Sequence, residues 1–300
     1  MPLTKVTKQS LPYFEDSSLL FATCADQPWA VYLDSAFPLS RQGRFDIMAY
    51  QPVCTLQTFG HSTHIDEQGV QTVSAEDPFE LLKARLGAPL PAIDELPFNG
   101  GAIGYFAYDL ARRIEKLPVS AEDAEQLPDM AIGIYRWAVV VDHQKRQSWL
   151  VGYGLADELV EAVSEQFSQV PEHFDLNNFK VFQAPRSNKS RQSYGQAFAK
   201  IKHYLKEGDC YQVNLTQRFS SPCRGNPWFA YQTLRRINAA PFSAYLNFPD
   251  VQVLSSSPER FLRVIDGQVQ TKPIKGTRPR KALASEDQKQ IAALAASDKD

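Results

Sequence analysis

Short apolar runs separated by turn-forming residues characterise the first 60 positions of the chain. Runs of this length between glycine, proline, aspartate or serine are typical of strands in an antiparallel sheet. We therefore expect strands at Leu19–Cys24, Ala30–Leu33, Ile47–Tyr50 and Cys54–Phe59. A later pair of apolar stretches, Ala131–Asp142 and Ser148–Tyr153, predicts a hairpin.

The last third of the chain continues this pattern. The stretches Pro241–Asn247 and Val251–Ser256 predict another hairpin, turned by a Pro-Asp pair. In Cys210–Phe219 apolar and polar residues alternate, which predicts a strand with Gln212 and Asn214 on its polar face. Such a face can simply be solvated, and periodicity alone does not separate that interpretation from a binding role.

Five further stretches have the spacing or the end signals of helices. The best-defined one follows Ser190, a plausible N-cap, and carries apolar residues at positions 194, 198, 201 and 205 before Gly208 ends it. The predicted helices are Asp77–Leu86, Asp157–Gln169, Ser190–Glu207, Asn226–Asn238 and Ser285–Ala296. A polar, proline-bearing connection, residues 171–189, separates an N-terminal segment, 1–170, from a C-terminal segment, 190–300.

Composition narrows the class of protein. The chain of 300 residues is 43% hydrophobic and has a formal net charge of −2, with no basic stripe interleaved with aromatic residues, which excludes a nucleic-acid-binding class. Its four cysteines lack metal-binding spacing. No signal peptide and no apolar run of about 20 residues, the length that spans a bilayer, is visible. We expect a cytoplasmic α+β protein that does not enter a membrane.

The candidate chemistry lies around a predicted hairpin near the end of the chain. Asp266-Gly267, between the expected strands Phe261–Ile265 and Gln268–Lys272, is a strong signal for a tight turn. The hairpin would bring Glu259 and Lys275 to one place, and a carboxyl group beside an amine can serve acid–base or nucleophilic catalysis. On spacing alone, the simpler interpretation is a solvated basic loop, because charge runs usually face water. The basic residues of that loop are Lys272, Lys275, Arg278, Arg280 and Lys281.

Four motifs make the sequence similar to one enzyme family. They are GGAIGYFAYD at 100–109, GDCYQVNLTQRF at 208–219, SPERF at 257–261 and PIKGT at 273–277. Together they resemble the chorismate-utilising enzymes, which include anthranilate, isochorismate and aminodeoxychorismate synthases. The resemblance implies two antiparallel β-sheets packed face to face with helices outside.

The resemblance also assigns roles in catalysis. It places the family's general acid at Glu259 and, as in the aminodeoxychorismate branch, a nucleophilic lysine at Lys275. Gln212, Gly276 and Thr277 would then contact chorismate. Relatives that add water to the ring carry a lysine in the Gln212 position, so a glutamine there argues against that chemistry.

A second site implied by the resemblance is a small pocket that can hold tryptophan. The matching residues are Ser35, Arg44, Phe45, Asn214, Pro241, Phe242 and Ser243. Without the resemblance, turn chemistry and a surface ion pair are the simpler interpretation of Ser35 and Arg44.

The resemblance implies a partner and a cofactor outside this sequence. A separate glutamine amidotransferase subunit would supply ammonia, and Mg²⁺ would bind through ligands that family members carry beyond the position of Asp300. We therefore expect the chain to match a C-terminally incomplete member, with no metal ligands of its own and inactive alone. Two alternatives stay open: an anthranilate synthase, which Lys275 disfavours, and a non-catalytic module that binds tryptophan or a partner.

Overall fold

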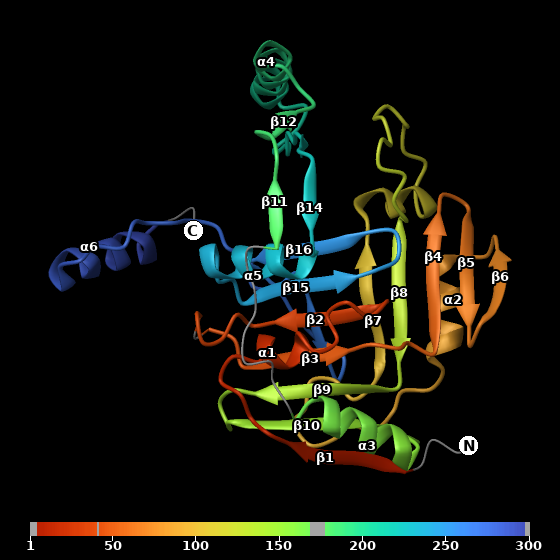
Figure 1. Ribbon diagram of the computed structural model, residues 1–300. Helices are drawn as coiled ribbons and strands as arrows, with labels where there is room; N and C mark the ends of the chain where they lie inside the picture. Colours follow the sequence, from red (N-terminus) through yellow and green to blue (C-terminus); the bar gives the residue numbers. More distant parts are fainter. Residues whose placement is uncertain (1–4, 41, 169–177, 298–300) are drawn as a thin grey trace. The chain divides into compact units, whose positions relative to one another are not determined.

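The computed structural model describes residues 5–40, 42–168 and 178–297 and divides into two compact units (Figure 1). The first unit combines Met1–Glu172 with Leu234–Asp300, and the second is His173–Thr233. The predicted segments 1–170, 171–189 and 190–300 therefore do not coincide with the compact units, since residues after 234 return to the first one. Residues 171–177 of the predicted connection and Gln169, the expected helix end, lie outside the described residues.

A seven-stranded antiparallel sheet forms one layer of the first unit. Its order is β1 (Val6–Leu11), β10 (Gln147–Tyr153), β9 (Trp137–Asp142), β3 (Phe45–Ala49), β2 (Ala30–Asp34), β15 (Phe242–Asn247) and β16 (Gln252–Ser257). The hairpin β15–β16 confirms the predicted pair near residue 250. Because Ser243 pairs with Asp34, strands about 200 residues apart in sequence become neighbours.

A five-stranded antiparallel sheet forms the other layer. It runs β6 (Val70–Ser74), β5 (Ser62–Glu67), β4 (Cys54–Phe59), β8 (Met130–Tyr135) and β7 (Gly101–Phe106). One apolar core contains residues of both sheets, such as Val31 and Val140 from the first and Ile103 and Ala131 from the second. The predicted α+β fold of two packed antiparallel sheets is confirmed.

One predicted strand is in fact two. The stretch Ala131–Asp142 separates at the exposed Arg136 into β8 and β9, which belong to different sheets. All twelve side chains of β8 and β9 are buried, so no alternation of polar and apolar residues marks the change of sheet. The continuous apolar run therefore gave the correct secondary structure but the wrong topology.

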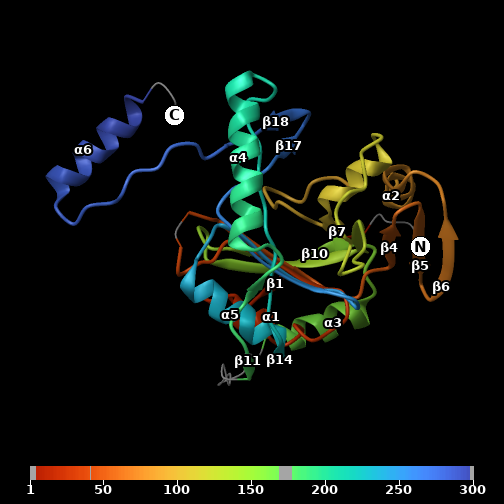
Figure 2. The same cartoon turned by 90° about the horizontal axis from the view of Figure 1, so that it is seen from above.

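Helices cover the sheets of the first unit. Figures 1 and 2 show α2 (Pro78–Leu86) against β4 and β8, and α3 (Asp157–Gln166) against β1 and β10. The 3-10 helix η1 (Tyr108–Arg113) follows β7, and α6 (Ala284–Ala295) ends the described chain. Asp77 caps α2 by accepting hydrogen bonds from two backbone N–H groups of its first turn.

The predicted strand at Leu19–Cys24 is wrong. The structure has a single helical turn there, α1 (Ser18–Phe21). Its neighbouring side chains Leu20 and Phe21 are both completely buried, which a half-buried strand with alternating faces would not allow. The Asp16 carboxylate accepts hydrogen bonds from the backbone and hydroxyl of Ser18 and supports the turn.

The second unit is built around the long helix α4 (Arg191–Glu207). Ser190 caps its start, and Gly208, with φ of 82°, ends it as predicted. Two short pairs accompany the helix, β11 (Phe179–Val181) with β14 (Cys223–Gly225) and β12 (Arg186–Ser187) with β13 (Phe219–Ser220). Helix α5 (Pro227–Ile237) begins in this unit and ends in the first.

The predicted strand Cys210–Phe219 is not formed. Of these residues only Phe219 is in a strand, the two-residue β13, and the Tyr211 side chain is fully exposed. Alternation alone cannot produce a strand, because its backbone groups need a neighbouring strand to pair with. Across the described ranges, no helix is both long and apolar enough to cross a membrane.

Candidate functional site

A tight hairpin, β17 (Arg263–Ile265) with β18 (Gln268–Gln270), lies at the predicted place. Asp266 and Gly267 turn it with φ values of 49° and 74°. Two consecutive positive φ values are the geometry that Asp-Gly pairs favour in two-residue hairpin turns. The expected hairpin is confirmed, with strands shorter than predicted.

The hairpin brings the two ends of the motif segment together. The backbone N–H of Ile274 donates a hydrogen bond to Glu259 Oε1, with 3.2 Å between nitrogen and oxygen. Thr271 Oγ1 donates to the carbonyl of Phe261 at 3.0 Å and closes the same end of the hairpin. The Glu259 carboxyl group therefore lies beside Ile274, the residue that precedes Lys275, although Glu259 and Ile274 are 15 positions apart.

The Ser257 hydroxyl fixes the backbone that carries Glu259. Ser257 Oγ accepts a hydrogen bond from the N–H of Glu259 at 3.3 Å and donates one to its carbonyl at 3.0 Å. Because Ser257 is the last residue of β16, the catalytic candidate is attached directly to the seven-stranded sheet.

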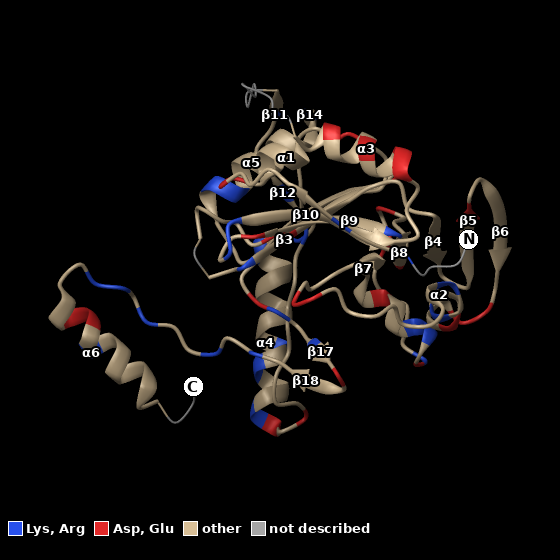
Figure 3. Ribbon diagram, turned by 90° about the horizontal axis from the view of Figure 1, so that it is seen from below, with Lys and Arg blue, Asp and Glu red and all other residues tan. Residues whose placement is uncertain are grey.

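The loop after β18 is exposed and basic. Glu259, Lys275 and Thr277 are exposed, and Gly276 is half-buried. Figure 3 shows lysine and arginine gathered along the segment between β18 and α6. Glu259 is therefore exposed, whereas burial is what usually keeps the carboxyl of a general acid protonated.

Most of the predicted tryptophan-pocket residues lie where β2 ends and β15 begins. Ser35 directly follows β2, and the pairing of Ser243 with Asp34 places Phe242 opposite Ser35, one position beyond the paired residues. Pro241 directly precedes β15, and Phe45 begins β3 beside β2 and β9. The first unit thus brings these predicted residues to one end of its larger sheet.

Ser35 is held tightly but its hydroxyl is not. The residue is 3% exposed, and within the described part of the chain its Oγ has no hydrogen-bond partner. Gly43 lies directly against it, because a Cβ atom built on Gly43 would be 2.2 Å from the Cβ of Ser35. Only glycine permits this approach.

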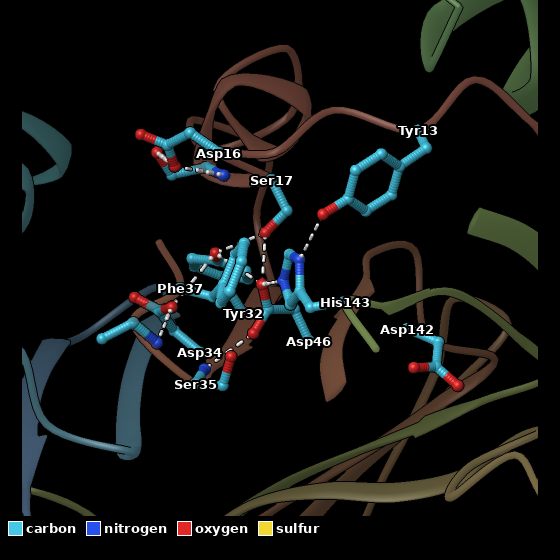
Figure 4. Close-up of polar contacts among 12 residues, drawn as sticks. Tyr13, Asp16, Ser17, Tyr32, Asp34, Ser35, Phe37, Asp46, Asp142 and His143 are labelled. Carbon is cyan, nitrogen blue, oxygen red and sulfur yellow. Dashed lines mark hydrogen bonds and ion pairs between the residues drawn. The ribbon is translucent and has the colours of Figure 1, made fainter. Parts of the chain in front are cut away.

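A buried polar cluster supports the backbone of Ser35 (Figure 4). The Asp46 carboxylate at its centre accepts hydrogen bonds from the Ser35 N–H at 2.7 Å and from Ser17 Oγ at 2.5 Å. His143 Nε2 lies 2.6 Å from the same carboxylate. Burial opposes ionisation of Asp46, but the hydrogen bond and charge of His143, with the hydrogen bonds of Ser17 and Ser35, lower its pKa overall.

Arg44 is engaged in an ion pair. Its guanidinium contacts both carboxylate oxygens of Asp142, the shortest contact being 2.7 Å, and reaches Glu95 at 3.1 Å. The guanidinium also lies over the ring of Phe45, 4.4 Å from its centroid. Burial of Asp142 acts to raise the pKa of its carboxyl, but the hydrogen bonds from Arg44 and two backbone N–H groups lower it overall.

The sequence argument missed most of this cluster. The local pattern marks Asp46 only as a polar residue near a strand end and gives Ser17, Tyr32 and His143 no role. A usable signal was available in His143, which directly follows the wholly buried strand β9. A titratable residue in that position needs a buried partner.

The remaining predicted residues lie elsewhere. Gln212 and Asn214 belong to the second unit, where residues 212–217 have no regular secondary structure, and their roles stay predictions. Within the described ranges, no group of three or more histidine, cysteine, aspartate or glutamate residues is arranged to hold a metal ion.

Comparisons with known proteins agree with the motifs. The family model described as chorismate binding enzyme matches residues 30–300. Aminodeoxychorismate synthase component 1 of Klebsiella aerogenes is 44% identical over 296 residues, which cover 97% of this chain and 64% of that protein. The protein of the same name from Escherichia coli (strain K12) is 42% identical over 284 residues, covering 93% and 61%.

Anthranilate synthases are more distant relatives. Component 1 from Acetivibrio thermocellus is 30% identical over 305 residues, covering 94% of this chain and 61% of that protein. The crystal structure of anthranilate synthase component I from Streptococcus pneumoniae TIGR4 superimposes with a TM-score of 0.70 at 26% identity, covering 87% of this chain and 58% of that one. The chain spans less than two thirds of the length of these relatives.

Proposed function

The chain belongs to the chorismate-binding enzyme family, and from this premise we propose that it acts in an aminodeoxychorismate synthase, as component 1. The enzyme would convert chorismate and ammonia to 4-amino-4-deoxychorismate, a precursor of para-aminobenzoate and folate. The observation that supports the proposal is the hydrogen bond from the Ile274 N–H to Glu259, which brings this carboxyl group to the residue before Lys275. The 44% identity to the Klebsiella aerogenes aminodeoxychorismate synthase component 1, against 30% to the Acetivibrio thermocellus anthranilate synthase component 1, favours this branch.

The proposed reaction proceeds through a covalent intermediate on Lys275. The lysine nitrogen bonds to ring carbon C2 and gives up a proton, both ring double bonds shift by one position, and the C4 hydroxyl leaves as water with a proton from Glu259. Ammonia then bonds to C4 and gives up a proton, both double bonds shift back, and the bond between C2 and the lysine nitrogen breaks as that nitrogen takes up a proton. The product carries an amino group at C4, and Lys275 returns to its amine form.

The substrate and partner follow from the same family. The backbone of Gly276 and the hydroxyl of Thr277 are positioned next to Lys275 and would donate hydrogen bonds to a carboxylate of chorismate. Gln212 is proposed as a further substrate contact on the basis of the family motif. Ammonia would come from glutamine through a separate amidotransferase subunit.

Intact-mass spectrometry tests the lysine mechanism. The chain would be mixed with chorismate and Mg²⁺, both alone and fused to the part of the Klebsiella aerogenes relative that lies outside the match. We expect a chorismate-derived adduct on the fused chain, lost in Lys275→Ala and kept in Lys281→Ala, an exposed lysine of the same basic loop. An adduct that survives in Lys275→Ala contradicts the proposed nucleophile, and anthranilate as the released product with ammonia would instead favour the anthranilate synthase branch.

We also propose that the end of the larger sheet binds tryptophan. The free hydroxyl of Ser35, the exposed ring of Phe242 and the ring of Phe45 offer one polar contact and two aromatic walls. Since the Arg44 guanidinium is already paired with Asp142, it would shape this pocket by lying over Phe45. Pro241 and Ser243 complete the wall, and Asn214 is proposed on the motif alone.

A further inference from the structure

Burying the Asp46 carboxylate without hydrogen-bond donors would strongly destabilise the fold, so the groups around it indicate what it does. It is 0% exposed, and a buried carboxylate is tolerated only when donors surround it. Four donors do so here: Ser17 Oγ, His143 Nε2, the Ser35 N–H and, at 3.4 Å, the Tyr32 hydroxyl. One of the four belongs to the backbone of the residue whose hydroxyl is left free.

We propose that Asp46 is a positioning residue, which holds the backbone of Ser35 so that the Ser35 hydroxyl stays available to a polar group of the bound ligand. This inference rests on the proposed tryptophan pocket and deepens it. Asp46 itself does not touch the ligand; it acts through Ser35.

The segment around Ser35 is fixed on both sides. Before it, Asp34 Oδ1 accepts a hydrogen bond from the Ala36 N–H at 2.6 Å. After it, the carbonyl of Phe37 accepts one from Arg235 at 2.6 Å, and the Phe37 ring stacks on His143 with 4.3 Å between centroids. With Gly43 against its Cβ atom, Ser35 has little freedom to turn its hydroxyl elsewhere.

The hydroxyl of Ser243, on the strand paired with β2, has a partner that the hydroxyl of Ser35 lacks within the described residues. Ser243 is also 3% exposed, but its Oγ donates to the carbonyl of Ala240 at 2.8 Å. A buried hydroxyl without a partner destabilises the folded chain. A ligand that supplies the missing partner recovers that free energy, and a fixed hydroxyl loses little entropy when it binds.

The hydrogen bond and the charge of His143 both favour the ionised form of the Asp46 carboxylate. Burial raises the pKa of the Tyr13 phenol, which therefore keeps its proton and can donate it to His143 Nδ1 at 3.1 Å. The two ring nitrogens of His143 thus bridge Tyr13 and Asp46, with Nδ1 at 3.1 Å from the Tyr13 hydroxyl and Nε2 at 2.6 Å from the carboxylate. The other charged groups near this pair are Glu15, Asp142 and Arg146, which act on Tyr13 from the neighbouring loops, and the Arg146 guanidinium lies over the Tyr13 ring at 5.1 Å.

Calorimetric titration with L-tryptophan tests the inference on this chain and two variants. In Asp46→Asn an amide NH₂ group, which is a donor, replaces one of the acceptor oxygens that face the four donors. We therefore expect Ser35 to shift and the affinity for L-tryptophan to fall about tenfold. Tyr32→Phe is the matched control, because it removes a buried hydroxyl from the same cluster but leaves the Ser35–Asp46 hydrogen bond intact. We expect its affinity to stay within about twofold, even where its melting temperature falls as far as that of Asp46→Asn.

The outcomes separate the inference from the pocket itself. No binding by the parent overturns the tryptophan pocket and the inference with it. Binding by the parent with equal binding by Asp46→Asn overturns the inference alone, as does an equal loss in Tyr32→Phe, which would reflect general destabilisation.

A second measurement needs no variant. With ¹⁵N-labelled serine, the Ser35 amide of the parent should resonate downfield, exchange slowly with solvent, and keep its position when L-tryptophan is added, because its bond to the carboxylate already exists. A rapidly exchanging Ser35 amide, or one that moves downfield only with ligand, contradicts the preorganised arrangement.

Discussion

Single residues around Ser35 explain why the first unit tolerates so much buried charge. Asp34, Asp46 and Asp142 are each at most 2% exposed, and each accepts hydrogen bonds from a cation or imidazole as well as from backbone N–H groups. Removing one member of such a set leaves the others unpaired in a medium of low polarity. The close contact at Gly43 and the buried carboxylates are therefore the positions where single substitutions should have the largest effects.

Gly43→Ala should destabilise the chain. The new methyl group would meet the Ser35 Cβ at 2.2 Å, and neither backbone can withdraw without breaking the hydrogen bond of Ser35 to Asp46. Overpacking of this kind costs about 1–3 kcal/mol in the free energy of unfolding, measurable by urea denaturation. Gln42→Ala, at the exposed neighbouring position, serves as control and should stay within about 0.5 kcal/mol.

Stability should fall in acid through Asp46 and Asp142. Both carboxyl groups have a folded-state pKa below the ordinary value of 3.8. Their contribution to the free energy of unfolding is therefore complete above the unfolded-state pKa of about 3.9. It is lost as the pH falls through that value toward the folded-state pKa. Urea denaturation between neutral pH and pH 3 should show this loss, and Asp142→Asn should be less stable at neutral pH but less sensitive to acid. An unchanged pH dependence in that variant would contradict the assignment.

Elements with strong local signals could be predicted from the sequence. Asp77 and Ser190 cap helices, Gly208 ends one, and Asp266-Gly267 turns the hairpin, because each of these signals acts over a few residues. Elements that depend on pairing with a distant strand could not be predicted in this way. The stretch at 210–219 has the pattern of a strand, yet only Phe219 in it pairs with another strand.

The turn at Gly267 should govern the stability of the hairpin β17–β18. Gly267→Ala places a side chain at φ of 74°, which costs about 1 kcal/mol, whereas Gly267→Asn tolerates this conformation better. We expect amide hydrogen exchange of the hairpin residues 263–270 to accelerate in the alanine variant and much less in the asparagine variant. Because the hairpin joins Glu259 to Ile274, the Ile274 amide should accelerate with it. Equal exchange in parent and both variants would show that the turn does not govern the hairpin.

At the scale of the molecule, the first unit is completed by a distant part of the chain. Strand β15 joins the sheet beside β2, and Arg235, 2% exposed, binds Asp34 at 2.7 Å and Asp16 at 3.0 Å. Burial opposes the charge of Arg235, but the nearby Tyr32, Asp34 and Asp16 raise its pKa overall. The guanidinium therefore links the end of α5, the turn before α1 and the end of β2.

Arg235→Met should destabilise the first unit strongly. Loss of the guanidinium leaves the Asp34 carboxylate buried without its cation, and breaking a buried pair costs about 3–5 kcal/mol. Arg236→Met is the matched control, since Arg236 is the exposed neighbour on the same helix and should change the free energy of unfolding by about 0.5 kcal/mol or less. Urea denaturation of the two variants measures the difference, and equal stability would contradict the role given to Arg235.

The sequence by itself determined the local elements, the family and the residues of the motifs. These depend on turn chemistry, on apolar periodicity and on side chains that can be read one position at a time. Only the tertiary structure decided that Ala131–Asp142 changes sheets at Arg136, that Leu20 and Phe21 are buried as a helical turn, and that Asp46 holds Ser35. The physical reason is that burial and strand pairing depend on partners far away in the chain: the charge of Asp46 is stable only beside His143, about 100 residues later, and no local pattern specifies that contact.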